Sequence, residues 1–138
     1  MKNLLASIRE LSRGRIISVF GHGGDRFSEN RPQLGKIAAS FADKIIITSD
    51  NPRSEDPCLI ADQIYRGSVV SNPDKNVSII LDRKEAVFTA LSDARDGDIV
   101  VISGKGPERE IVYENHRIPY NDLDAMVSWS QTTGVKIL

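Results

Sequence analysis

The sequence of 138 residues predicts an α/β fold in a single domain, with an open, mostly parallel sheet flanked by helices. Short runs of isoleucine and valine alternate along the chain with segments whose apolar residues recur at helical spacing. Right-handed crossovers between such strands produce an open, doubly wound sheet. The chain is also long enough to bury a core of its own.

The first half of the chain predicts two strands and three helices. Residues 2–12 carry leucine and isoleucine at helical spacing, and Gly14 ends this amphipathic helix. Proline at the first turn marks the start of two later helices. The elements expected next are a strand at 15–20, a helix from Pro32 to Phe41, a strand at 44–48 and a helix from Asp56 to about Arg66.

The second half continues the alternation and then changes. We expect a strand at 77–81, a helix from Asp82 to about Ala94, and a strand at 99–102. Residues 110–113 and 116–119 flank a short polar turn and predict an antiparallel hairpin, which we expect at one edge of the sheet. A final helix is expected to begin with Asn121 as its cap.

The composition excludes several classes of function. The formal net charge is -1, so no basic surface indicates nucleic-acid binding. No apolar run approaches the length of a membrane span, and no signal peptide is recognisable. One cysteine, Cys58, and two histidines are too few for a disulfide or a typical zinc site. We therefore expect a cytoplasmic protein that binds neither metal, membrane nor nucleic acid.

Three polar loops directly follow predicted strands, at residues 21–26, 50–53 and 104–108. The carboxyl ends of parallel strands lie at the same edge of a sheet, and ligands of open α/β sheets bind there. These loops are therefore expected to form one site.

The side chains of these loops suit a zwitterion. The guanidinium groups of Arg26 and Arg53 match a carboxylate, and acidic or amide groups can bind an ammonium group. An amino acid is the simplest such ligand. The expected substrate-binding residues are Arg26, Asp50, Asn51, Arg53, Gly104 and Glu108, and the expected supporting residues are Gly21, Gly23, Gly24, Asp25 and Lys105.

Each loop taken alone also has a simpler interpretation. Residues 21–24 and 50–52 are ordinary turn sequences, and Lys105 either contacts phosphate or is solvated. Arg26 stands where a dinucleotide-binding fingerprint requires glycine, and the sequence contains no P-loop. The residues alone therefore indicate a small polar ligand and no catalytic group.

Several motifs also resemble a known family, the Mur ligases. These motifs are Gly21–Arg26, Arg31-Pro32, Thr48–Pro57, Asp82-Arg83, Gly97-Asp98 and Gly104–Glu108, which cover nearly the whole chain in order. They resemble the C-terminal domain of the UDP-N-acetylmuramoyl-tripeptide synthetases, and the Asp50-Asn51-Pro52-Arg53 loop is the most specific match. One departure is Pro107, which stands where the family usually has histidine.

The resemblance implies a Rossmann-like domain that binds the amino-acid substrate. Family enzymes use ATP and Mg²⁺ to make an acyl phosphate on a UDP-linked muramoyl dipeptide, and the incoming amine attacks it. The Asp-Asn-Pro-Arg loop is typical of members that add meso-diaminopimelate. By this resemblance Arg53 and Asn51 hold the distal carboxylate, Arg26 also contacts diaminopimelate, Gly104 and Glu108 bind its distal amino-acid end, and Asp50 braces the loop.

The family's central ATP-binding and N-terminal UDP-binding domains have no counterpart in residues 1–138. We therefore expect this chain alone to bind no cofactor and to be inactive as a ligase. It would bind meso-diaminopimelate or a similar amino acid, and the missing Mur ligase domains could act in trans. The alternatives are a stand-alone, non-catalytic sensor of diaminopimelate or muropeptide, and a structural remnant without a ligand.

Overall fold

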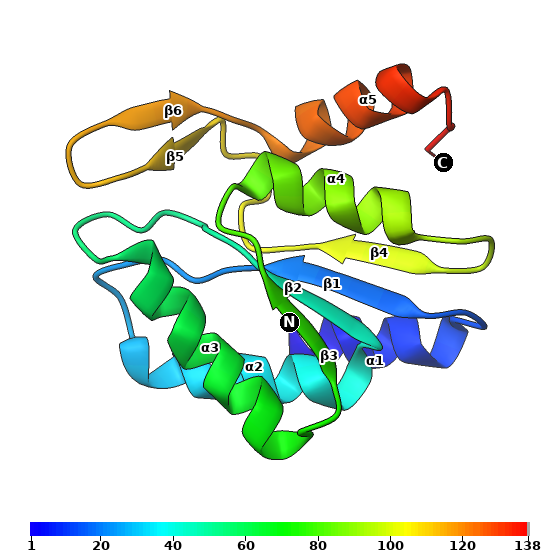
Figure 1. The fold of residues 1–138 in the computed structure, drawn as a ribbon, viewed down its shortest axis with the longest axis horizontal. Helices are drawn as coiled ribbons and strands as arrows, with labels where there is room; N and C mark the ends of the chain where they lie inside the picture. The colour runs from blue at the N-terminus through cyan, green and yellow to red at the C-terminus, as the bar shows by residue number, and fades with distance from the viewer. Residues whose placement is uncertain (138) are drawn as a thin grey trace.

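A computed structural model describes residues 1–137 and contains a central sheet between two layers of helices (Figure 1). The sheet has four parallel strands in the order β3-β2-β1-β4. This arrangement confirms the predicted α/β class. The strands are β1 (Ile16–Phe20), β2 (Lys44–Ile47), β3 (Asn76–Ile79) and β4 (Ile99–Ile102).

Helices cover both faces of this sheet (Figure 1). On one face lie α1, α2 and α3, and on the other face lie α4 and α5. The helices are α1 (Lys2–Leu11), α2 (Arg31–Phe41), α3 (Pro57–Ser71), α4 (Arg83–Asp93) and α5 (Asp122–Thr133), and a short 3-10 helix, η1 (Ser28–Asn30), precedes α2. No helix within residues 1–137 is both long enough and apolar enough to cross a membrane.

Alternating side chains of the strands build the two halves of the core. In β1, Ile16 and Phe20 pack toward α1, α2 and α3, whereas Ile17 and Val19 pack toward α4 and α5. All five residues of β1 are buried. A strand covered on both faces has no polar side, which explains why four of its five residues are apolar, with Ser18 as the exception.

Helices α2 and α3 approach each other through two glycines. A Cβ atom on Gly35 would lie 2.0 Å from the Ile64 carbonyl oxygen, and one on Gly67 would lie 2.0 Å from the Pro32 carbonyl oxygen. Gly67 is therefore a packing residue inside α3, and the helix continues to Ser71 rather than ending near Arg66 as the sequence suggested.

Side-chain caps fix the predicted starts of three helices. Asp56 accepts a hydrogen bond from the Cys58 amide (2.8 Å) and Asp82 from the Glu85 amide (3.0 Å). Asn121 accepts one from the amide of the third residue of α5 (3.1 Å). Each cap satisfies an amide that the helix itself leaves unpaired, so these loops end at defined residues.

The C-terminal hairpin is present, but it does not extend the main sheet. Strands β5 (Glu110–Val112) and β6 (Arg117–Pro119) form a separate antiparallel pair. The Arg53 amide donates to the Val112 carbonyl (3.0 Å), so β5 is attached to the loop after β2 instead of to an edge strand. The hairpin thus lies beside the strand ends, where the three polar loops converge.

Candidate functional site

The three polar loops predicted from the sequence converge on one cavity. It has a volume of about 620 Å³ and lies at the carboxyl ends of β1, β2 and β4. All six predicted substrate-binding residues line it. The cavity also has an apolar wall, formed by Met1, Leu4, Phe20, Phe27 and Leu34.

Asn51 is the hub that joins two of the loops. It is only 6% exposed. Its Oδ1 accepts hydrogen bonds from Lys105 Nζ (2.9 Å) and from the Val112 amide (3.0 Å), and its Nδ2 donates to Glu108 Oε1 (2.8 Å). An amide nitrogen carries two hydrogens. Asn51 therefore retains one N–H for a ligand and otherwise braces the site.

Lys105 is a buried structural residue. Its side chain is fully buried, and its ammonium group also lies 3.3 Å from Glu108 Oε1 and 3.4 Å from Asp50 Oδ1. Neither alternative left by the sequence, a phosphate contact or a solvated side chain, agrees with this position. Lys105 instead joins the acidic and amide groups of two loops, which supports its predicted supporting role.

The first two loops are locked together by their backbones. The Gly24 amide donates to the Asn51 carbonyl (2.8 Å), and Arg53 Nη1 donates to the Gly24 carbonyl (3.0 Å). A Cβ atom on Gly24 would lie 1.7 Å from the Pro52 carbonyl oxygen, so only glycine fits there. Arg53 itself has a φ of 53°, a conformation that non-glycine residues rarely adopt. The guanidinium group of Arg53 is thus held at the cavity by both loops.

The cavity presents charged side chains of both signs. Its lining contains two arginines, Arg26 and Arg53, and two carboxylates, Asp50 and Glu108, while the buried Lys105 ammonium pairs with both carboxylates. Arg26 is exposed, and no side chain among residues 1–137 pairs with its guanidinium group. Arg26 and the remaining N–H groups of Arg53 are therefore available to an anionic ligand.

Glu108 remains ionised at neutral pH. Burial alone raises the pKa of this carboxyl, but hydrogen bonds from Asn51 and Lys105 and the charges of Lys105 and Arg53 outweigh that effect, so its pKa lies below the usual range. Its side chain is 46% exposed. A charged, accessible oxygen is thus available for the ammonium group of a ligand.

Two buried arginines support the site but were given no role by the sequence. Arg31 contacts Gly23 in the first loop and Glu55, which lies two residues after the second loop. Arg83 donates to the carbonyls of Ser49 (3.1 Å) and Ser103 (3.0 Å), which directly precede the second and third loops. Asp122 pairs with Arg83 from α5 at 2.8 Å. Both arginines belong to the motifs Arg31-Pro32 and Asp82-Arg83, which were the only signals of their importance.

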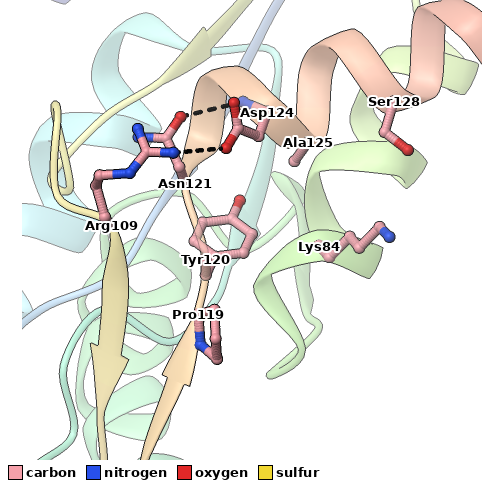
Figure 2. Close-up of a pocket in the computed structure, with 8 residues that line it drawn as sticks. All are labelled: Lys84, Arg109, Pro119, Tyr120, Asn121, Asp124, Ala125 and Ser128. Atoms are coloured by element: carbon pink, nitrogen blue, oxygen red, sulfur yellow. Dashed lines mark hydrogen bonds and ion pairs between the residues drawn. The ribbon is translucent and has the colours of Figure 1, made fainter.

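A second cavity, of about 410 Å³, lies between α4, α5 and the hairpin (Figure 2). It shares no lining residue with the strand-end cavity. Arg109 and Asp124 form an ion pair with each other at its rim (3.1 Å), as Figure 2 shows. Lys84 is the one other charged residue among those that line it, so this cavity lacks the two arginines and two carboxylates that line the strand-end cavity.

Comparison with known proteins now connects this geometry to a family. Residues 1–106 match the family described as "Mur ligase, glutamate ligase domain". The chain belongs to the Mur ligase C-terminal domain family. The match covers all of the first two loops and the start of the third, so the resemblance inferred from the sequence motifs is confirmed.

Two of the most similar relatives carry the same name. The UDP-N-acetylmuramoyl-L-alanyl-D-glutamate--2,6-diaminopimelate ligase of Syntrophomonas wolfei is 44% identical over 88% of this chain and 25% of its own length. The enzyme of the same name from Aquifex aeolicus is also 44% identical, over 91% of this chain and 26% of its length. The chain therefore spans about a quarter of the length of these relatives.

A solved structure agrees with the sequence relatives. A structure of UDP-N-acetylmuramoyl-L-alanyl-D-glutamate--2,6-diaminopimelate ligase superimposes with a TM-score of 0.84 at 31% identity. The match covers 98% of this chain and 27% of that structure. The α/β fold, including the separate hairpin, is thus also found in one part of a solved ligase structure.

Proposed function

We propose that this chain is the amino-acid-binding domain of a ligase that adds meso-diaminopimelate to UDP-N-acetylmuramoyl-L-alanyl-D-glutamate. The observation that carries the proposal is the strand-end cavity, which presents two arginines together with an ionised glutamate. Residues 1–138 then correspond to the C-terminal domain of such an enzyme, whose relatives carry this name.

The polar groups divide into two sets that match one end of an amino acid. Arg53 and Arg26 bind the distal carboxylate, and one remaining N–H of Asn51 assists them. Glu108 and the Gly104 carbonyl bind the distal ammonium group. Asp50 braces the loop, because its Oδ1 lies 3.4 Å from the ammonium nitrogen of Lys105.

The apolar wall suits the hydrocarbon chain of the same ligand. Phe20, Phe27 and Leu34 line the cavity beside the arginines. Methylene groups placed against them leave water, which contributes about 0.8 kcal/mol for each buried CH₂. A cavity with one charged end and one apolar wall therefore fits a long, doubly functional amino acid better than a small one.

Arg53 explains how the site would reject lysine. Lysine has no distal carboxylate, so binding it leaves the Arg53 guanidinium without its ionic partner in a partly buried position. A binding site built to pair with a polar group discriminates strongly against an analogue that lacks this group.

We assign the chemistry of ATP activation to other segments of such a ligase. Among residues 1–137 no cluster of three or more histidine, cysteine, aspartate or glutamate side chains is arranged to hold a metal ion. The sequence has no phosphate-binding P-loop either. The role that we propose for residues 1–137 is to bind and orient the amine substrate.

The proposal is tested by titrating ¹⁵N-labelled protein with meso-diaminopimelate, with L-lysine as the matched control. We expect chemical-shift changes at residues 21–26, 50–53 and 104–108 with diaminopimelate alone, at a dissociation constant of about 1 mM. Equal responses to both amino acids would contradict selective recognition. No response at tens of millimolar ligand would contradict a binding site preformed in this chain.

A further inference from the structure

An ion pair between buried Arg31 and partly exposed Glu55, neither of which lines the cavity, connects the segments that carry two of its loops. Arg31, the first residue of α2, is fully buried and does not line the cavity. Its Nη1 and Nη2 donate to the two carboxylate oxygens of Glu55, both at 2.8 Å. This two-pronged geometry fixes both side chains in direction as well as in distance.

The same guanidinium also binds the first loop. Nη2 donates to the Gly23 carbonyl (3.1 Å), and Nε donates to His22 Nδ1 (3.2 Å). The pKa of His22 lies below its usual range, because burial and the positive charge of Arg31 disfavour the imidazolium. His22 is therefore neutral and accepts this bond, so Arg31 holds two consecutive residues of the loop.

Glu55 completes the connection from the other side. Its Oε1 accepts a hydrogen bond from the Asp25 amide (2.7 Å). The Asp25 carboxylate in turn accepts bonds from the amide and hydroxyl groups of Ser54. Hydrogen bonds from Arg31 and Asp25 lower the pKa of Glu55 to about 2, so the pair stays charged throughout the neutral range.

These contacts surround two residues with unusual backbones. Asp25 has a φ of 60° and Arg53 a φ of 53°. Non-glycine residues persist in this region only when neighbouring contacts determine their conformation. The Arg53 guanidinium reaches the first loop at Gly24, one residue after the carbonyl that Arg31 holds.

We propose that Arg31 and Glu55 are positioning residues that set the orientation of Arg53 by clamping residues 21–26 against residues 50–55. This inference rests on the proposed function for its effect on ligand choice. The clamp itself is a property of the free protein. It makes selection between diaminopimelate and lysine depend on two side chains that touch no ligand.

The test uses Glu55→Gln and Arg31→Lys. Gln keeps the shape of Glu55 but places an N–H₂ against the guanidinium, and Lys keeps the charge of Arg31 but loses its fork. In both variants we expect hydrogen exchange of the Gly24 and Asp25 amides to accelerate by about tenfold or more relative to core amides. We expect the preference for diaminopimelate over lysine to fall by a similar factor.

Arg15→Lys is the control, because Arg15 forms a comparable network with Asp93 and Asp98 at the opposite end of β1. It should lose stability without changing loop exchange or ligand preference. Unchanged exchange in both clamp variants would overturn the proposal, and so would faster exchange with an unchanged preference. If the wild-type protein binds neither amino acid, the proposed function fails, while faster exchange in the variants alone still supports the clamp.

Discussion

The contact between Gly24 and Pro52 makes a quantitative prediction for Gly24→Ala. The new Cβ would lie 1.7 Å from the Pro52 carbonyl oxygen, whereas ordinary van der Waals contact begins at 3.4 Å. The loops must therefore separate by about 1.7 Å, the difference between these two distances.

Such a separation removes two hydrogen bonds. The Gly24 amide and the Asn51 carbonyl are 2.8 Å apart, and Arg53 Nη1 and the Gly24 carbonyl are 3.0 Å apart. Both distances would exceed the range of a hydrogen bond. With about 1 kcal/mol for the backbone bond and about 1.5–3 kcal/mol for the charged one, we expect a loss of about 2.5–4 kcal/mol.

Urea unfolding followed by circular dichroism measures this loss. The control is Gly97→Ala, because a Cβ on Gly97 meets nothing within 4 Å, although Gly97, unlike Gly24, has a positive φ (89°). The control should lose only about 1–2 kcal/mol, the cost of the left-handed backbone. If Gly24→Ala lost no more stability than Gly97→Ala, the close packing of the two loops would be refuted.

Three further predictions follow from the site. Asn51→Ala leaves the Val112 amide and the buried Lys105 ammonium without the oxygen that accepts their hydrogen bonds. The free energy of unfolding, measured by urea titration, should therefore fall by about 2–4 kcal/mol. A loss below about 0.5 kcal/mol would contradict the role of Asn51 in joining the loops. Lys105→Met removes a hydrogen bond and a positive charge from Glu108, so the pKa of Glu108, followed by NMR of its carboxyl carbon, should rise; an unchanged pKa would count against the contact. Glu55 has a folded-state pKa of about 2, below its ordinary value of 4.5, so its stabilising effect is present above pH 4.5 and is lost as the pH falls toward 2. The stability difference between wild type and Glu55→Gln, measured at several pH values, should therefore shrink over this range, and a constant difference would disprove the ion pair.

Much of the fold was predictable because apolar runs and caps are local signals. Short segments predict the isoleucine-rich strands and the helix caps at Asp56, Asp82 and Asn121. The order of these strands and helices then predicts that the three loops lie at one edge of the sheet. The end of α3 was not predictable, because Gly67 looks like a terminator until its contact with Pro32 is known.

The interior of the site was less predictable than its rim. Lys105 and Arg31 are charged residues in polar segments, where solvent exposure is the ordinary expectation. Each is buried because its partners come from distant positions, such as Asn51 for Lys105 and Glu55 for Arg31. The docking of the hairpin onto the loop after β2 depends on a backbone bond between Arg53 and Val112, which no local pattern encodes.

The most direct test of the account compares wild type and Arg53→Ala in calorimetric or NMR titrations with meso-diaminopimelate and with L-lysine. Arg53 is held by the Gly24 carbonyl at the cavity and is the residue proposed to pair with the distal carboxylate. We expect wild type to prefer diaminopimelate, and the variant to bind both amino acids equally weakly. A variant that retained the wild-type preference for diaminopimelate would contradict the central claim that Arg53 selects the ligand.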